Sequence, residues 1–202
     1  MGDVVALRQH DDAVSRPWST VIPEIRNGLC PDYAVLLGGK HVAYDPRMTV
    51  TEPASAAASV DINADPAAVY ALITNLTSLA ALTEEAHAMQ WQKGSAASPG
   101  AVFKGSNRNG SKSWNTTCTV TAAEPGKAFA FDVKFLVVPI SHWRYDITAT
   151  ENGCRVTEST WDRRPGWFKP IGGLSTGVSD RDGANAEHIK LTLGRLKAEA
   201  EG

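Results

Sequence analysis

Three ionisable side chains are candidates for acid–base chemistry or for anchoring a ligand inside an apolar interior: Tyr145, Glu158 and Asp182. A carboxyl group held in a pocket can act as a general acid or base, or can fix the polar end of a ligand. The spacing of these three residues closes no constellation of nucleophile, base and orienting group. The sequence therefore supports binding better than catalysis, and it assigns no catalytic residue.

The orientation of Glu158 has two interpretations. Glu158 shares a strand face with Cys154, Val156 and Thr160, and if that face is the apolar one, the acid is buried and needs a cation or a hydrogen-bond donor. If the register flips at Cys154, Glu158 is exposed and Trp161 joins the inner side. We favour the exposed orientation because it buries Trp161. The candidate cationic partners, interpreted mainly as surface charges, are Arg144, Arg155, Arg163 and Arg164.

Other reaction centres lack their sequence signatures. The histidines show no metal-ligand spacing with one another, and none has a cysteine neighbour at CxxC distance. There is no GxSxG elbow for a nucleophilic serine, and GAVFKGSNRNG lacks both the Walker lysine–hydroxyl pair and the dinucleotide pattern. We therefore expect no metal site and no cofactor. The histidines are His10, His41, His87, His142 and His188.

Aromatic side chains recur on one face of several predicted strands. In residues 127–161 the large apolar side chains alternate with small or charged ones, so each set points to one side of a sheet. Such a face must be covered, either by another element alone or by an element together with a bound apolar molecule. The set can be the wall of a ligand pocket or ordinary core under a helix. Its members are Phe103, Trp114, Phe129, Phe131, Phe135, Trp143 and Tyr145.

The last segment, about 178–200, has no proline and predicts one long helix. On the face centred on Ile189, the C-terminal half is apolar, with Leu193 and Leu196, whereas the N-terminal half presents Asp182 and Asn185. These two polar residues can face a cavity mouth or a polar ligand group. Alternatively, they belong to a solvated first turn, where the helix dipole favours Asp182.

The remaining elements supply a sheet that can position these residues. A strand at 60–63 leads to a helix that Asp65 caps and Pro66 opens, and a second short helix follows at about 78–85. Six strands come next, separated by turn signals, and Pro165, Gly166 and the pair Gly172-Gly173 predict a loop before the last helix. The order predicts an α+β fold in which a curved antiparallel sheet of about seven strands wraps around the long helix.

The first part of the chain has a different character. Residues 1–52 carry four prolines, with Pro53 directly after them, and only short apolar pieces, so we expect a weakly ordered extension, with a short hairpin around Val35–Tyr44. Met48 opens a stretch that would itself make a plausible start, so the extension can also be a start-site artefact. Residues 53–202 are expected to form one ligand-binding domain. Within it, residues 54–59 are predicted to be a linker or the frayed beginning of a strand.

The totals exclude several classes of partner. The net charge is −2 across 202 residues, with 43% hydrophobic and 21% charged residues, so nucleic acid is not an expected partner. No apolar run is long enough to span a bilayer, and the N-terminus has no signal-peptide pattern. The odd count of cysteines, Cys30, Cys118 and Cys154, predicts reduced thiols in a cytoplasmic protein. The sequence leaves the oligomeric state open.

Four segments together resemble the SRPBCC (START-like, helix-grip) superfamily, specifically its polyketide cyclase/dehydrase and lipid-transport branch of the actinobacterial type. The resemblance covers roughly residues 57–202 and rests on VDINADPAAVYALITNL, GAVFKGSNRNG, WNTTCTVTAAEPGKAFAFDV and GCRVTESTWDRRPGW. It implies a cavity between the sheet and the long helix that holds a hydrophobic small molecule. It implies no single activity, because members include transfer proteins, hormone receptors and cyclases.

Three functions remain under this resemblance. The first is binding of a lipid- or polyketide-like molecule by a carrier or sensor, and we rank it first. The second is a polyketide cyclase, aromatase or dehydratase, and the third is an interaction domain with a filled core. The expected ligand-binding residues are Phe103, Trp114, Phe131, Trp143, Tyr145, Asp182, Asn185 and Ile189. We expect a cavity of roughly 300–1,000 Å³.

Overall fold

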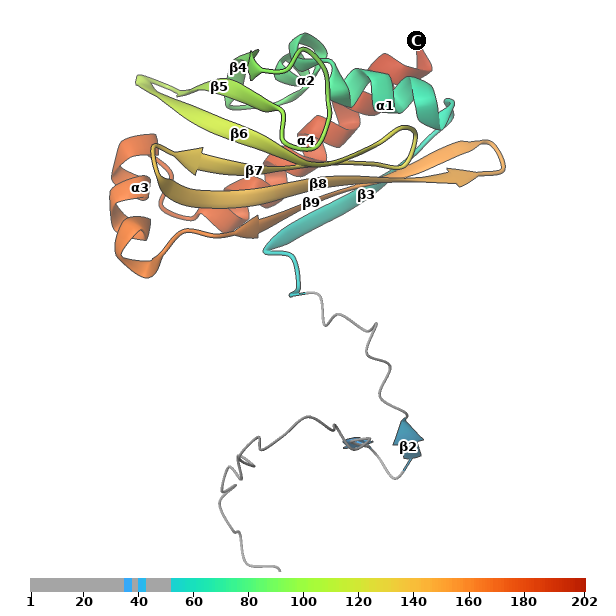
Figure 1. The fold of residues 1–202 in the computed structure, drawn as a ribbon, viewed down its shortest axis with the longest axis horizontal. Helices are drawn as coiled ribbons and strands as arrows, with labels where there is room; N and C mark the ends of the chain where they lie inside the picture. Colours follow the sequence, from blue (N-terminus) through green and yellow to red (C-terminus); the bar gives the residue numbers. More distant parts are fainter. Residues whose placement is uncertain (1–34, 38–39, 43–51) are drawn as a thin grey trace, which may run out of the picture. The chain divides into compact units, whose positions relative to one another are not determined.

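A seven-stranded antiparallel sheet forms the main body of the protein in a computed structural model that describes residues 35–37, 40–42 and 52–202. The sheet order is β3-β9-β8-β7-β6-β5-β4, so the first and last strands of this body lie side by side at one edge (Figure 1). The strands are β3 (Ala56–Ile62), β4 (Ala86–Lys93), β5 (Val102–Asn109), β6 (Lys112–Glu124), β7 (Ala128–Phe135), β8 (Val138–Thr150) and β9 (Gly153–Asp162).

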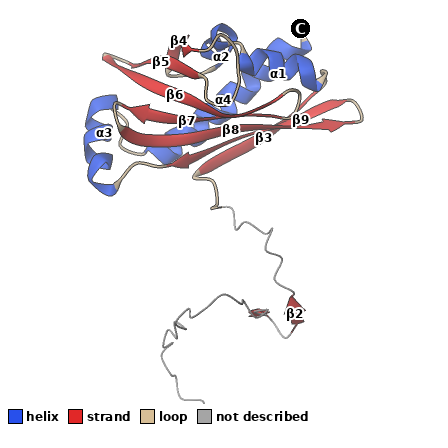
Figure 2. Cartoon of the chain, in the orientation of Figure 1, coloured by secondary structure: helices blue, strands red, loops and turns tan. Residues whose placement is uncertain are grey.

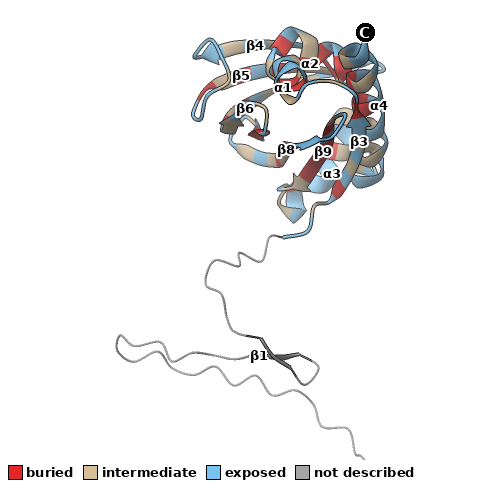
Figure 3. Ribbon diagram, turned by 90° about the vertical axis from the view of Figure 1, so that its right-hand side faces the viewer, coloured by how far each residue is buried: buried red, intermediate tan, exposed pale blue. Residues whose placement is uncertain are grey.

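The helices complete an α+β fold of the predicted helix-grip type. The long helix α4 packs on one face of the sheet, chiefly against β3 and β9, while the short pair α1 and α2 closes one end (Figure 2). Figure 3 shows the sheet curling around this interior. The predicted fold class is confirmed. The helices are α1 (Pro66–Thr74), α2 (Leu76–Leu82), α3 (Lys169–Thr176) and α4 (Arg181–Glu201), with a 3-10 turn, η1 (Gly166–Phe168), before α3.

The two short helices are separated by one residue that caps both. Asp65 accepts a hydrogen bond from the Ala67 backbone N–H at 2.7 Å, and this cap and Pro66 start α1 as predicted. Asn75 ends α1, and its side chain accepts hydrogen bonds from the N–H groups of Thr77 and Ser78. Because this cap lies two residues earlier than expected, α2 begins at Leu76 rather than at Ser78.

Two segments differ from their predicted conformations. Residues 56–59 are part of β3, paired in register with β9, rather than a linker or frayed end. The predicted loop around Gly172-Gly173 is η1 and α3. Pro170 lies in the first turn of α3, where its missing N–H costs no hydrogen bond, and Gly177 ends the helix with a φ of 74°. Gly172 is buried against the Phe168 ring, so this glycine allows close packing and does not break the helix.

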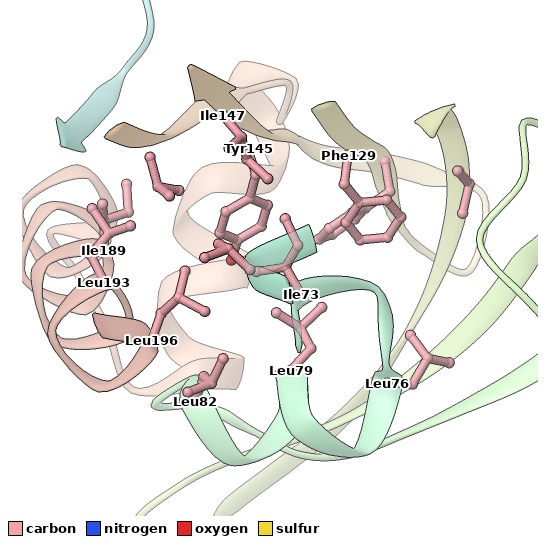
Figure 4. Packing of buried hydrophobic residues seen from close by; sticks show 14 of the residues in the cluster. Ile73, Leu76, Leu79, Leu82, Phe129, Tyr145, Ile147, Ile189, Leu193 and Leu196 are labelled. Carbon is pink, nitrogen blue, oxygen red and sulfur yellow. The ribbon is translucent and has the colours of Figure 1, made fainter. Parts of the chain in front are cut away.

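The core joins the sheet to α1, α2 and α4. Ile189, Leu193 and Leu196 of α4 point toward Tyr145 on the sheet and toward the α1–α2 pair (Figure 4). Burial of these side chains stabilises the folded state by about 25 cal/mol for each Å² of apolar surface removed from water. Among the described cysteines, Cys118 and Cys154 are buried and free of disulfides. The cytoplasmic location stays a prediction.

The segment before residue 51 groups as a separate unit from residues 51–202. Its described part is an antiparallel pair, β1 (Val35–Leu37) with β2 (Lys40–Val42), inside the range where a hairpin was predicted. In the described part of the chain, no helix is both long enough and apolar enough to cross a membrane. That residues 53–202 form the ligand-binding domain and residues 1–52 an extension stays a prediction.

Candidate functional site

A cavity of about 570 Å³ lies between the inner face of the sheet and the helices α3 and α4. Strands β4 to β9 contribute side chains to its wall, and α2 adds Leu79. The volume lies inside the expected range. An interaction domain with a filled core, the third hypothesis, would have no cavity of this size. The interior therefore has room for a molecule of drug or lipid-fragment size.

The wall is mainly aromatic and aliphatic. Phe103 and Phe131 meet edge to face, with ring centroids 5.2 Å apart. Trp143 satisfies its indole N–H by donating to the Ser141 hydroxyl at 2.9 Å, so its ring can face an apolar space at no cost in hydrogen bonds. Of the predicted aromatic set, all but Phe129 line the cavity, and Phe129 is fully buried in the core.

The long helix adds a mixed face to this wall. Asn185 and Ile189 line the cavity and are buried, as is Thr192 one turn further on. Asp182 does not line it. This residue is exposed in the first turn of α4, because the helix begins at Arg181 and Asp180 provides the cap. The position predicted for Asp182 at the polar end of the cavity is therefore wrong.

Glu158 is the most unusual group of the wall. It is only 2% exposed and lies directly opposite Tyr145 in the β8–β9 register. The Tyr145 hydroxyl donates a hydrogen bond to Glu158 Oε1 at 2.7 Å, whereas Oε2 has no hydrogen-bond partner among the described residues. The favoured exposed orientation of Glu158 is thus wrong.

The physical reason lies in the places that the structure gives to two other residues, Tyr145 and Trp161. The hydroxyl of Tyr145 satisfies one oxygen of the buried acid, which the strand pattern alone does not reveal. Trp161 has an independent place on the other face of β9, where its indole N–H donates to the Glu52 carbonyl at 2.7 Å. Its ring also lies 5.4 Å from that of His142.

Burial changes the acid–base properties of this pair. Burial raises the pKa of Glu158 from 4.5 to about 8, and the hydrogen bond from Tyr145 only partly opposes this change. The pKa of Tyr145 is also raised, first by burial and then by the charge and hydrogen bond of Glu158. At neutral pH the pair is therefore mostly uncharged, with one proton on each residue.

Arginines at two places in the wall are already paired with carboxylates. Arg181 donates to both oxygens of Glu85 at 2.7 Å. Arg164 donates to Asp162, which also meets Lys169 at 3.1 Å. Burial disfavours ionisation of Asp162, but the hydrogen bonds from Arg164 and Lys169 outweigh this and lower its pKa to about 2. The charges of Arg164 and Arg181 are therefore already balanced by carboxylates of the protein.

The cavity reaches the surface beside the β7–β8 turn. Leu136 lines the cavity and is nevertheless 79% exposed, and Phe168 of η1 also lines the cavity. The ring of Phe168 is 6.3 Å from that of Phe135, and these two rings connect η1 to the end of β7. Other large exposed apolar side chains of the β7–β8 turn, η1 and α3 are Val137, Trp167, Ile171 and Leu174.

Comparison with protein families agrees with this architecture. The family described as "Polyketide cyclase / dehydrase and lipid transport" matches residues 53–201. The chain belongs to this family. The predicted superfamily is thereby confirmed, while the actinobacterial type stays a prediction. A comparison with curated proteins gives no match.

Solved structures with the same fold include two di-domain ARO/CYC proteins. The di-domain ARO/CYC StfQ from the steffimycin biosynthetic pathway is 14% identical, with a TM-score of 0.56 over 72% of this chain and 50% of StfQ. The di-domain ARO/CYC BexL from the BE-7585A pathway is 18% identical, with a TM-score of 0.55 over 72% of this chain and 49% of BexL.

Protein CV1439 from Chromobacterium violaceum is 13% identical, with a TM-score of 0.55 over 74% of this chain and 99% of that protein. Likeness at these identities shows the fold alone. This family member spans about half the length of the two di-domain proteins.

Several wall residues of this family member were not anticipated from sequence. The contribution of η1 and α3 was missed because glycine and proline there predict a loop. His188 and Thr192 also line the cavity. The helical spacing from Asn185 to Ile189 and Thr192 is the signal that could have found Thr192. The described residues contain no cluster of three His, Cys, Asp or Glu side chains able to hold a metal ion.

Proposed function

We propose that this protein binds a hydrophobic small molecule, lipid-like or polyketide-like, in its internal cavity and acts as a carrier or sensor of that molecule. The observation that carries the proposal is the cavity of about 570 Å³ with a mainly apolar wall. The family description and the ARO/CYC neighbours support the same chemical class of ligand. The proposed contact residues are the seven predicted positions that line the cavity, without Asp182.

A dye-binding experiment tests the proposal. An uncharged environment-sensitive dye should bind the purified protein, and Trp143→Ala should change its affinity because this ring is part of the wall. Lys134→Ala and Trp161→Ala serve as controls, because neither residue lines the cavity. Native mass spectrometry after gentle purification identifies a copurifying molecule. Equal effects of all three substitutions, or no dye binding, would contradict the proposal.

A second candidate function is catalysis by the same cavity. Glu158 favours it, because an acid with a pKa of about 8 can exchange protons near neutral pH. In a cyclase or dehydratase, such a group would take a proton from an activated methylene or give one to a keto oxygen. Incubation with a poly-keto thioester mimic, followed by mass spectrometry, distinguishes the two functions. An enzyme turns the mimic over and loses turnover with Glu158→Gln, whereas a carrier returns it unchanged.

A further inference from the structure

The cavity wall contains a buried side-chain oxygen that lacks a hydrogen-bond partner in the described part of the chain. This atom is Glu158 Oε2, which is fully buried, whereas Oε1 accepts a hydrogen bond from Tyr145 at 2.7 Å. Buried polar atoms are almost always paired, and an unpaired one costs about 1–3 kcal/mol. Glu158 lines the cavity, and its Oε2 atom is shielded from the empty space, so a bound molecule meets this atom when a small rotation of the carboxyl group turns Oε2 toward the cavity.

We infer that Glu158, positioned by Tyr145, is the polar anchor of the cavity, and that the ligand is an uncharged apolar molecule whose carbonyl or hydroxyl oxygen accepts a hydrogen bond from Glu158 Oε2. This inference rests on the proposed function, because it names the class of ligand for the same cavity. The bond is directional: Tyr145 already donates to Oε1, so the acidic proton of the neutral carboxyl group belongs on Oε2. The ligand must then provide the acceptor.

The charges around the cavity favour a neutral ligand. A carboxylate or phosphate head group needs an unpaired cation, but Arg164 and Arg181 are already engaged by Asp162 and Glu85. A cationic ligand would require Glu158 to be ionised, which its burial opposes. The other titratable or charged groups in the wall are Tyr145 on β8, Cys118 on β6, Asp162 on β9, Arg164 just after it, His188 and Arg181 on α4, and Glu84 and Glu85 before β4.

Four naphthalene probes that differ only in one substituent test the inference by displacement of phenylnaphthylamine, an uncharged dye. The probes are ethylnaphthalene, acetylnaphthalene, naphthoate and aminomethylnaphthalene. The full-length protein should bind acetylnaphthalene about three- to tenfold more tightly than ethylnaphthalene, the range of one neutral hydrogen bond. This preference should be present at pH 6 and should disappear as Glu158 ionises above pH 8.

Three variants assign the effect to Glu158. Glu158→Leu should abolish the preference for the ketone, and Glu158→Gln should restore it without pH dependence, because its amide N–H donates at every pH. Glu187→Gln, a matched change on the exposed side of α4, should behave like the unmodified protein. Circular dichroism checks that each variant is folded. The pH profile and the glutamine variant keep the test decisive even if Glu158→Leu fails to fold.

The possible outcomes separate the two proposals. Binding of none of the probes would overturn the proposed function itself. Equal binding of acetylnaphthalene and ethylnaphthalene would overturn the anchor alone and leave an apolar cavity. Tightest binding of aminomethylnaphthalene would mean that Glu158 is an ionised receptor for cations, and tightest binding of naphthoate would mean that an arginine is free to bind anions. Either result would contradict the inference.

Discussion

Glu158 and Tyr145 show how two side chains can change the character of an apolar interior. Neither residue is unusual in sequence, but the register of β8 and β9 places them opposite each other and away from water. Removal from water disfavours the carboxylate, and a single hydrogen bond from a phenol compensates only part of that cost. The pair therefore brings a polar, proton-bearing group into a wall that is otherwise hydrophobic.

The raised pKa of Glu158 predicts how stability depends on pH. Between pH 4.5 and about 8 the folded protein holds a proton on Glu158 that the unfolded chain has released. The free energy of unfolding should therefore decrease as pH rises through this range, by on the order of 1 kcal/mol per pH unit from this group. Urea unfolding across the range measures the slope. Glu158→Gln should flatten it; an unchanged slope would show that Glu158 is not the responsible group.

Tyr145→Phe should change the properties of Glu158 by removing its hydrogen-bond donor. The substitution leaves Glu158 Oε1 without its donor, and this should lower the free energy of unfolding by about 1–3 kcal/mol. It should also raise the pKa of Glu158 further, and so shift the loss of stability to higher pH, because the hydrogen bond from Tyr145 favours the ionised acid. Tyr70→Phe is the matched control, since the Tyr70 hydroxyl donates no hydrogen bond within the described part of the chain. Equal effects would argue against the pairing.

At the scale of elements, two connections position the cavity wall. The β8–β9 hairpin aligns Tyr145 with Glu158, and its turn ends at Gly153, whose φ is 146°. The segment η1–α3 covers the other end and is tied to β9 through Asp162, which meets both Arg164 and Lys169. Each connection contains one position, Gly153 or Asp162, at which a single substitution tests its role.

Gly153→Ala should be strongly destabilising. An added Cβ would overlap the Ile62 carbonyl oxygen and would lie 2.8 Å from the Ala64 nitrogen, so the backbone of the β3–α1 turn would have to move. Gly110→Ala is a useful comparison, because its φ is 54° but nothing lies within 4 Å of an added Cβ. Backbone strain alone should cost about 1–2 kcal/mol there. Thermal unfolding should show a clearly larger loss for Gly153→Ala, and comparable losses would refute the predicted overlap.

Asp162→Asn should loosen η1 and α3 while leaving the sheet intact. The change removes the charge that Arg164 and Lys169 share, and hydrogen bonds to charged groups are worth about 1.5–3 kcal/mol when partly buried. Hydrogen exchange in residues 166–176 should accelerate more than exchange in β7 and β8. Asp132→Asn, which loses an exposed pair with His142, should have little effect. Uniform acceleration across the domain would mean that α3 does not open independently.

At the scale of the whole molecule, the fold could be predicted from the sequence but parts of the site could not. Period-two alternation identifies the inner faces of β7 and β8, and the cap at Asp65 fixes the start of α1. The orientation of Glu158 could not be predicted because it depends on Tyr145, a partner from a neighbouring strand. The helix α3 could not be predicted because the glycines of this segment indicate a loop. The contact between Lys169, the first residue of α3, and Asp162 on β9 cannot be identified from the sequence of the segment alone.

Residues 1–47 are predicted to be dispensable for folding of the ligand-binding domain. A protein beginning at Met48 keeps Glu52, whose carbonyl accepts from Trp161 and whose carboxylate accepts from Arg163 at 2.8 Å. Its melting midpoint should fall by less than about 8 °C. A protein beginning at Ala54 also loses Glu52 and should melt at a lower temperature than the one beginning at Met48. A larger fall on removal of residues 1–47 would show that the segment is integral.

The pairing of β3 with β9 also has a consequence for biosynthesis. Ala58 pairs with Glu158, so β3 leaves the ribosome long before β9, its partner among the described strands, has been made. At about 5–20 residues per second, the nascent strand waits for several seconds or longer. Its sequence, AAASVDI, is rich in alanine and contains an aspartate, a composition with low tendency to form intermolecular strands. The small side chains and the charge of β3 are therefore expected to lower the risk of intermolecular strand pairing before the chain is complete.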